Sequence, residues 1–314
     1  YIDGKDYLYA VSEALENAKH EIYIEDWWLS PEVYLRRTPA ENEHWRLDNI
    51  LKRKAEQGVL IYVVVYKEVK QALTLDSQHT KLTLQALHPN IRVQRHPDHA
   101  ALLATTLQWA HHEKIVVVDR KMAFIGGIDL CFGRWDTHNH NLADNDPLNP
   151  KSEVFIGQDY SNPRIRDFED VKVWDVCIID KKNLARMPWH DLSIGMIGDA
   201  VNDVTRHFVD RWNFVKNVKS EDRDEIEELA LPPKSIIKKE EFGKMKTQVL
   251  RSSTKWSTGF SHEKSIQNAY IHTIQHAEHF IYIENHTNIK KFLLAVFEGK
   301  PVIFPGLIFV NKAS

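Results

Sequence analysis

The sequence has few cysteines and no long uninterrupted apolar run. Only Cys131 and Cys177 occur among the 314 residues, which is too few for a disulfide framework and favours a reducing compartment such as the cytosol. The longest apolar stretch, residues 292–310, is interrupted by Glu298, Lys300 and two prolines. These interruptions exclude it as a membrane-spanning helix.

The chain also lacks a strong excess of either charge. Its net charge of −3 gives no general attraction to nucleic acid or to anionic membranes, so any phosphate-binding surface must be local. Tyr1 is not preceded by methionine and no apolar segment follows it, so we expect no secretory signal and an N-terminus cut from a longer chain. The 43% of apolar residues suffices to bury a large core.

Short runs rich in isoleucine, valine and tyrosine alternate with helical patterns. The runs are mostly continuous, as expected for strands buried on both faces. Residues 6–20 and 45–58 have apolar residues spaced by three and four, and Gly58 ends the second as a C-cap. We therefore expect an α/β fold with a mixed β-sheet flanked by helices. The expected strands are 20–28, 59–66, 90–96, 114–120, 122–130 and 171–180.

One segment is repeated within the chain. Residues 18–25, AKHEIYIE, recur as residues 277–284, AEHFIYIE, each time after a helical pattern, which indicates duplication of a helix and a strand. Residues 219–248 are charged and poor in aromatics, as in a linker or surface excursion. We expect a first lobe over 1–218, this linker, and a truncated second lobe with a divergent C-terminus over 249–314.

Residues 111–136 place titratable groups at both ends of an apolar strand. His112 and Lys114 are two residues apart and therefore project to the same side, whereas Asp119 follows the strand. Gly126 and Gly127 would let backbone N–H groups approach an anion closely. Imidazole can attack phosphorus, lysine can neutralise phosphoryl oxygens, and a carboxylate can orient the histidine. The alternative is a partly exposed strand with solvated ends.

The complete pattern resembles the signature of the phospholipase D superfamily. It reads H-x-K-x-x-x-x-D followed by Gly-Gly-x-Asp, and its residues are His112, Lys114, Asp119, Gly126, Gly127 and Asp129. Strings such as EDWWLSPEVYLRR, GGIDLCFGRWDTHNH and RHFVDRWNFVK resemble the eukaryotic phosphatidylcholine-hydrolysing enzymes. The resemblance extends over nearly all of residues 1–285.

This resemblance implies a layered phospholipase D-like sandwich and a role for each matching residue. His112 would be the nucleophile that forms a phosphohistidine, Lys114 would bind the phosphodiester oxygens, and Asp119 would support the histidine. Gly126, Gly127 and Asp129 would complete the phosphate site. The family's chemistry requires no metal or other cofactor. The implied products are choline and phosphatidic acid, or a phosphatidyl alcohol when a primary alcohol replaces water.

The second motif of the family has no clear counterpart. His262 and Lys264 form a later H-x-K, but Ala269 stands where aspartate is required. We therefore expect an incomplete form of a phospholipase D. Two alternatives stay open, a catalytically inactive phosphoinositide-binding remnant and another phosphodiesterase of the superfamily.

A basic segment suggests how such a protein would meet a membrane. The resembling region of the family binds phosphatidylinositol 4,5-bisphosphate, an expected activator, although a solvated helix face with Phe208 and Trp212 in the core explains the pattern equally well. We expect a peripheral protein on the cytosolic face of membranes, with phosphatidylcholine and small GTPases as partners and no nucleic acid. The candidate phosphoinositide-binding residues are Arg206, Arg211, Lys216 and Lys219.

Other polar and aromatic residues have competing interpretations. Trp27 and Trp28 line either a substrate wall or the core, and residues 134–136, RWD, indicate a buried ion-pair anchor. Several histidines suggest a metal, but their spacing fits no standard zinc pattern, so we expect no metal site. These histidines are His96, His99, His138 and His140.

Overall fold

A computed structural model of the chain describes residues 1–68, 73–96, 111–144, 150–219, 226–232, 247–282 and 307–311. The chain divides into two units, Tyr1–Phe242 and Gly243–Ser314. The expected division, with a linker over 219–248, stays a prediction.

A six-stranded mixed sheet, in the order β3-β2-β1-β4-β5-β6, forms the centre of the first unit. Strands β1, β2 and β3 are parallel, whereas β4 pairs antiparallel with β1, β5 with β4, and β6 with β5. The reversal between β1 and β4 places the start of β4 beside the end of β1. The strands are β1 (Glu21–Asp26), β2 (Leu60–Tyr66), β3 (Ile91–His96), β4 (Ile115–Val118), β5 (Met122–Gly126) and β6 (Ser193–Ile197).

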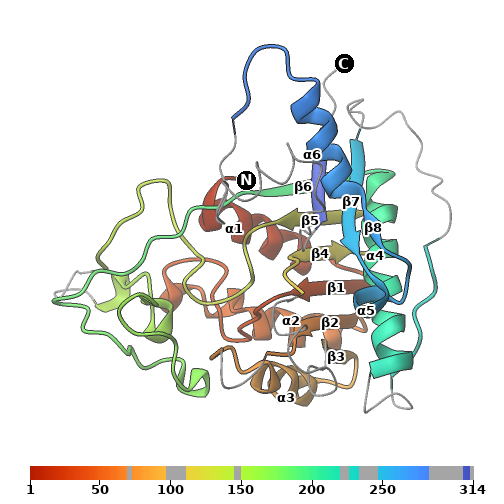
Figure 1. Ribbon diagram of the computed structural model, residues 1–314. Coiled ribbons are helices and arrows are strands. Elements are labelled where there is room, and N and C mark those ends of the chain that lie inside the picture. Colours follow the sequence, from red (N-terminus) through yellow and green to blue (C-terminus); the bar gives the residue numbers. More distant parts are fainter. Residues whose placement is uncertain are drawn as a thin grey trace. The chain divides into compact units, whose positions relative to one another are not determined.

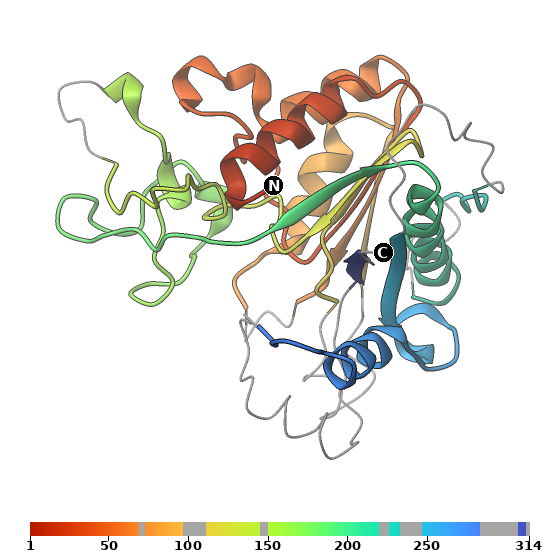
Figure 2. The ribbon, with the colours of Figure 1, turned by 90° about the horizontal axis from the view of Figure 1, so that it is seen from above.

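Helices cover both faces of this sheet. Figures 1 and 2 show α1 (Asp3–Glu16), α2 (Leu47–Glu56) and α3 (Ser77–Leu87) on one face and α4 (Ala200–Phe214) on the other. Ile22 and Ile24 join the core cluster of α1, whereas the intervening Tyr23 stacks on Phe208 of α4 with ring centroids 4.7 Å apart. This alternation buries β1 on both sides and confirms the predicted α/β fold.

Five of the six expected strands are confirmed, and the sixth is wrong. Residues 171–180 form the short 3₁₀ helix η7 (Val171–Val173) and irregular structure, with Val173 and Val176 exposed. The sixth strand is instead β6, which sequence reasoning missed because it is short, contains Gly195 and alternates between buried and exposed residues at the edge of the sheet.

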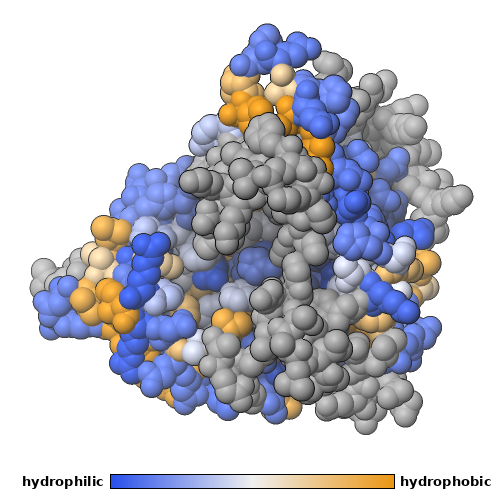
Figure 3. Space-filling view, viewed as in Figure 1, coloured by the Kyte–Doolittle hydropathy of each residue, from blue (hydrophilic) through white to orange (hydrophobic). Residues whose placement is uncertain are grey.

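Residues 127–144 and 150–192 belong to a long loop region with its own aromatic contacts. The described part includes η7 and the 3₁₀ helices η5 (Pro150–Ser152) and η6 (Gly157–Asp159). Trp28 packs edge-on against Phe168, with ring centroids 4.5 Å apart, and so joins this region to the core. Apolar residues such as Ile165 and Val176 are nevertheless exposed on it. Figure 3 shows hydrophobic groups, in orange, on the part of the surface where Figure 1 draws this region.

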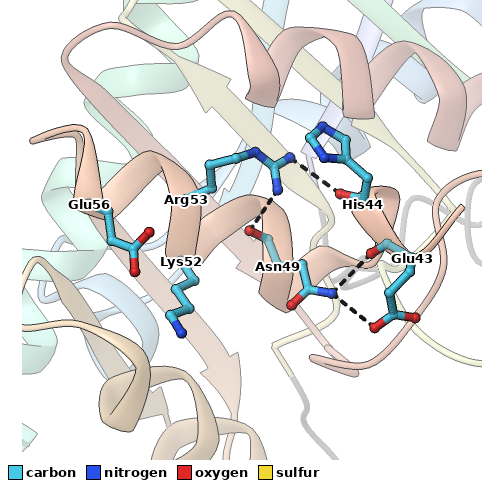
Figure 4. Close-up of a pocket in the computed structure, with 6 residues that line it drawn as sticks. All are labelled: Glu43, His44, Asn49, Lys52, Arg53 and Glu56. Carbon is cyan, nitrogen blue, oxygen red and sulfur yellow. Dashed lines mark hydrogen bonds between the residues drawn. The ribbon is translucent and has the colours of Figure 1, made fainter.

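A polar pocket lies at α2 and the turn before it. The 3₁₀ helices η1 (Pro39–Glu41) and η2 (Glu43–Trp45) precede α2. Arg53 donates to the carbonyls of Asn49 and His44, and Asn49 donates to Glu43, so these groups are paired within the protein (Figure 4). We assign this pocket no function. Its lining residues are Glu43, His44, Asn49, Lys52, Arg53 and Glu56.

Part of the expected linker packs in the first unit. A π-helical turn, η8 (Val215–Lys219), extends α4. Glu227, which follows η8 in the chain, accepts two hydrogen bonds from other residues of the first unit. Its carbonyl accepts from Trp212 Nε1 at 3.0 Å, and its carboxylate accepts from the Tyr62 hydroxyl at 2.7 Å. Residues 226–232 therefore cover the end of α4 rather than extending into solvent.

The second unit contains a three-stranded sheet in the order β8-β7-β9 and two helices. The described residues of the second repeat include the expected helix, α6, but residues 277–282 are not a strand, and Phe280 is 83% exposed. Residues 283 and 284 lie outside the described residues. The elements are β7 (Thr247–Ser253), α5 (Lys255–Thr258), β8 (Glu263–Lys264), α6 (Ser265–Gln275) and β9 (Leu307–Asn311). Across the described parts of both units, no helix has the length and apolar character needed to cross a bilayer.

Asp119 fastens the turn after β4 to the start of β1. Its carboxylate accepts hydrogen bonds of 2.7–3.0 Å from the backbone N–H groups of residues 19, 20 and 21. Partial burial raises the pKa of Asp119, but the three donors outweigh it and leave that pKa below its ordinary value.

We predict that Asp119→Asn lowers the free energy of unfolding at pH 7 by about 1–3 kcal/mol, because an amide cannot accept from all three donors. Because the pKa of Asp119 is lower in the folded protein, its stabilising contribution is complete above roughly pH 3.9, the pKa of an unfolded aspartate. The contribution is lost as the pH falls through the pKa of Asp119 in the folded protein. Urea unfolding of both proteins between pH 3 and pH 7 measures the difference. Asp175→Asn, at an exposed loop position, is the control. Equal losses in the two variants would contradict the assignment.

Candidate active site

His112 and Lys114 face the same side of the chain just before β4. The imidazole of His112 lies 5.1 Å from the ring centroid of Trp27, and the Lys114 ammonium lies 5.7 Å from the same indole. His112 is exposed, whereas Lys114 is buried. The structure thus brings the two predicted residues together, with the lysine deeper than its expected position at an open strand end.

Asp129 holds Lys114 in this buried position. Lys114 Nζ lies 2.9 Å from Asp129 Oδ1, and both side chains are almost completely buried. The same oxygen accepts from the backbone N–H groups of Trp27 and Trp28 at 3.2 and 3.1 Å. Asp129 therefore connects the end of β1, the start of β4 and the loop after β5. Its carboxylate is occupied by the ammonium and by these two N–H groups, and its predicted place in a phosphate site stays a prediction.

The surroundings of His112 keep its imidazole neutral. The residue is exposed by surface area, yet the protein atoms around the ring still desolvate its charged form. Desolvation and then the Lys114 charge lower the pKa of His112 to about 4. A neutral imidazole retains the lone pair that nucleophilic attack requires.

His111 and Glu113, which alternate with His112 and Lys114 along the chain, point the other way into a buried ionic network beneath α4. His111 Nε2 lies 2.9 Å from Glu25 Oε1, and Glu113 accepts from His207 at 2.6 Å. Arg211 joins the two carboxylates, with Nε 2.5 Å from Glu25 and Nη2 2.9 Å from Glu113. The network fixes the backbone on both sides of His112.

Burial and neighbouring charges shift the pKa values of the two carboxyl groups in this network in opposite directions. Burial raises the pKa of Glu25 to about 8 and lowers that of His111 to about 3. Burial also raises the pKa of Glu113, but the charges of Arg211 and His207 overcome this and leave it well below its ordinary value. The Arg211 guanidinium is thus balanced mainly by Glu113.

The structure does not bring Asp119 to His112. The two residues lie at opposite ends of β4, and the Asp119 carboxylate is occupied by the start of β1. Asp119 therefore joins two parts of the sheet and does not lie beside His112, where it was expected. Asp119 is seven positions after His112, which is about 23 Å at strand geometry.

The expected anion-binding role of Gly126 and Gly127 also requires correction. Their N–H groups donate to the carbonyls of Lys114 and Leu192 at 3.3 and 2.9 Å and are not directed at an anion. A Cβ at Gly127 would lie 2.1 Å from the Asp191 carboxylate, and one at Gly126 would lie 2.1 Å from Ser193 Oγ. Glycine is needed here for the close approach of residues 191–193.

The basic residues of α4 and η8 do not form the predicted phosphoinositide site as a group. Arg211 is buried in the ionic network, which contradicts its expected contact with a lipid headgroup. Arg206 is exposed and Lys216 is half-buried, and the Lys219 side chain lies outside the described residues. Five helical positions rotate a side chain by about 140°, so Arg206 and Arg211 point to different sides. The alternative placement of Phe208 and Trp212 in the core is confirmed.

Further residues near the site were only partly foreseen. Trp27 lies beside His112, whereas Trp28 is a core residue. Arg134 Nε lies 3.8 Å from Asp129, and its guanidinium stacks 3.8 Å from the ring of Trp189, a residue that sequence reasoning missed. The neighbouring Asp136 forms a buried ion pair of 3.0 Å with Arg186. Residues 134–136 thus contribute two separate anchors instead of one.

Comparison with known proteins agrees with this arrangement. The sequence matches the family described as Phospholipase D over residues 14–291, so the chain belongs to the phospholipase D family. It is 45% identical over 296 residues to Phospholipase D1 of Saccharomyces cerevisiae, covering 90% of this chain and 17% of that protein. It is 40% identical over 330 residues to Phospholipase D2 of Bos taurus, covering 96% of this chain and 34% of that protein.

The human and bacterial relatives are more distant. Phospholipase D1 of Homo sapiens is 32% identical over 430 residues, covering 91% of this chain and 40% of that protein. The chain thus spans less than half the length of these three curated relatives. A solved structure of Nuc from Salmonella typhimurium, described as a phospholipase D family member, is 12% identical, with 65% of this chain and 86% of that chain covered. The TM-score for this structure is 0.34.

We predict that Arg211→Met lowers the free energy of unfolding by about 3–5 kcal/mol, because it leaves the buried Glu113 carboxylate without the cation that balances it. Arg206→Met, at an exposed position of the same helix, is expected to change it by less than about 0.5 kcal/mol. Chemical denaturation at pH 7 compares the two. Similar small losses would show that Arg211 is not confined to the buried network.

Proposed function

We propose that this chain carries the nucleophilic half of a phospholipase D active site acting on phosphatidylcholine. The observation that carries the proposal is an exposed, neutral imidazole beside a buried ammonium. Within the described residues, Lys114 Nζ has an ion-pair partner but no well-angled hydrogen bond, so it retains donors for an anionic oxygen. Membership of the phospholipase D family supports the same chemistry.

The first step is attack of a His112 ring nitrogen on phosphorus. The bond from phosphorus to the choline oxygen breaks, and that oxygen leaves with a proton supplied by a general acid. The positive charge of Lys114 stabilises negative charge on the phosphoryl oxygens, and Trp27 limits how the imidazole can rotate.

The second step regenerates the histidine. Water attacks the phosphohistidine, the bond from phosphorus to nitrogen breaks, and phosphatidic acid is released. A primary alcohol in place of water gives a phosphatidyl alcohol. Two displacements replace a single difficult one, and neither requires an electron carrier or other redox cofactor.

The membrane setting belongs to the same proposal. A phosphatidylcholine substrate requires the protein to meet a lipid surface, and the exposed apolar residues of the loop region, such as Ile165 and Val176, suit such contact. We further propose that the protein acts on the cytosolic face of membranes, that phosphatidylinositol 4,5-bisphosphate activates it and that small GTPases are its partners. Arg211 is withdrawn from the phosphoinositide site because it is buried.

We predict that His112→Gln abolishes cleavage of a phosphodiester with a 4-nitrophenolate leaving group, whereas His138→Gln retains it. Such a leaving group departs without a proton, so the assay tests the nucleophile separately from the general acid. The wild-type chain should also acquire a phosphoryl adduct on His112, located by mass spectrometry after rapid quenching. Equal cleavage by His112→Gln and wild type would remove His112 from the mechanism.

The pH dependence of the same reaction follows from the pKa of His112. The active form is the neutral imidazole, so the rate rises with pH through about 4 and is level from roughly pH 5 upwards. Single-turnover rates between pH 3.5 and pH 8, at pH values where the protein is folded, measure this profile. A midpoint near the ordinary histidine value of about 6.5 would contradict the proposed environment.

A further inference from the structure

A second group of ionisable side chains lies at the N-terminal end of α1. One ligand atom from each of Asp3, His140 and His190 lies within 4.8 Å of the others. The three come from the start of α1, the loop after β5 and the segment before β6, and Figures 1 and 2 show these parts next to one another. We propose that Asp3, His140 and His190 bind a divalent transition metal ion, with Zn²⁺ as the best match.

The donor set suits this class of ion. Two imidazole nitrogens and one carboxylate are ligands that zinc accepts, in a tetrahedral site whose fourth position is taken by water. Neighbouring ligands around a tetrahedral zinc are roughly 3.3 Å apart, since its bonds to nitrogen and oxygen are about 2.0–2.1 Å. His140 Nε2 lies 3.6 Å from Asp3 Oδ2, which is close to this spacing.

Asp136 lies behind His140. His140 Nδ1 is 3.4 Å from Asp136 Oδ2 without a well-angled hydrogen bond, and a small rotation of the ring would direct an Nδ1 proton at this carboxylate and leave Nε2 for the metal. Asp136 is itself held by Arg186 at 3.0 Å and by the backbone N–H of Trp189 at 2.8 Å. A carboxylate behind a ligand histidine is a common means of fixing its tautomer in metal sites.

Asp3 is equally well placed. Its side chain is 1% exposed, and its backbone N–H donates to the carbonyl of Asp191 at 2.9 Å, which holds the start of α1 against the segment before β6. His190 Nδ1 lies 2.6 Å from Asp3 Oδ1. The His190 side chain is 56% exposed and can therefore rotate by the small amount needed to admit an ion between the two atoms.

A second compact group of possible ligands among the described residues is excluded by its charge. Glu25, Glu113 and His207 also place ligand atoms within 4.8 Å of one another, but Arg211 occupies this cluster through contacts of 2.5 and 2.9 Å. A guanidinium in this position supplies the positive charge that a metal would bring. The Asp3 site has no such cation between its ligand atoms in the described part of the chain.

The proposed ion would have a structural role. It would connect α1 to the segment that passes the Gly126–Gly127 turn, since Gly127 donates to the carbonyl of Leu192. None of its ligands is in the His112 site. The expectation that the chain has no metal site was based on the spacing of histidines in the sequence, which cannot indicate ligands as far apart as Asp3 and His190.

Zinc binding by the chelator-treated full chain tests the proposal. We expect isothermal titration calorimetry at pH 7 to give one Zn²⁺ per chain, and Co²⁺ to give the visible absorption of a tetrahedral site. His140→Ala and His190→Ala should each weaken zinc binding by more than about 100-fold. His138→Ala is the matched control, because this exposed imidazole contacts Asp6 outside the site and its loss should leave affinity unchanged.

Thermal unfolding supplies a second measurement for variants of altered stability. Zinc should raise the melting temperature of the wild type and of His138→Ala, but not that of His190→Ala. The exposed side chain of His190 makes this position tolerant of substitution. Absence of stoichiometric zinc binding by the wild type would overturn the proposal. Equal affinity in His138→Ala, His140→Ala and His190→Ala would also overturn it.

Discussion

The buried ion pair between Lys114 and Asp129 is the constraint on which the site depends. An ammonium removed from water is costly unless an opposite charge lies close to it, and Asp129 supplies that charge at 2.9 Å. The same carboxylate accepts the amides of Trp27 and Trp28, so the pairing also fixes the indole that lies beside His112. The Asp129 side chain thereby positions both the ammonium of Lys114 and the indole ring beside His112.

The alternation of an extended chain explains how one short segment serves two purposes. Residues 112 and 114 face the site, while residues 111 and 113 face the network of Glu25, His207 and Arg211. The buried side has histidine and glutamate because α4 covers it with complementary charged groups. The backbone around His112 is consequently held from behind by ion pairs and from the side by β-sheet pairing.

Much of the first unit follows from its sequence pattern, because strands buried on both faces are continuous apolar runs. Strand β6 does not follow, since an edge strand with Gly195 lacks that pattern. The pairing of His112 with Lys114 was predictable from their separation of two residues. Three features could not be predicted because each depends on a segment far away in the chain. These are the position of Asp119, the close packing at Gly127 and the burial of Arg211. The alternation that placed His112 and Lys114 together also implied an opposite, buried role for His111 and Glu113.

The central claim is that His112 is a neutral nucleophile held beside a fixed positive charge. Its most direct test is an NMR titration of the His112 imidazole in the labelled protein, with the resonance assigned by its loss in His112→Gln. The account predicts a midpoint near pH 4, because desolvation and Lys114 both disfavour the imidazolium. A midpoint at about 6.5, the value of an unperturbed histidine, would show that neither influence reaches the ring and would contradict the account.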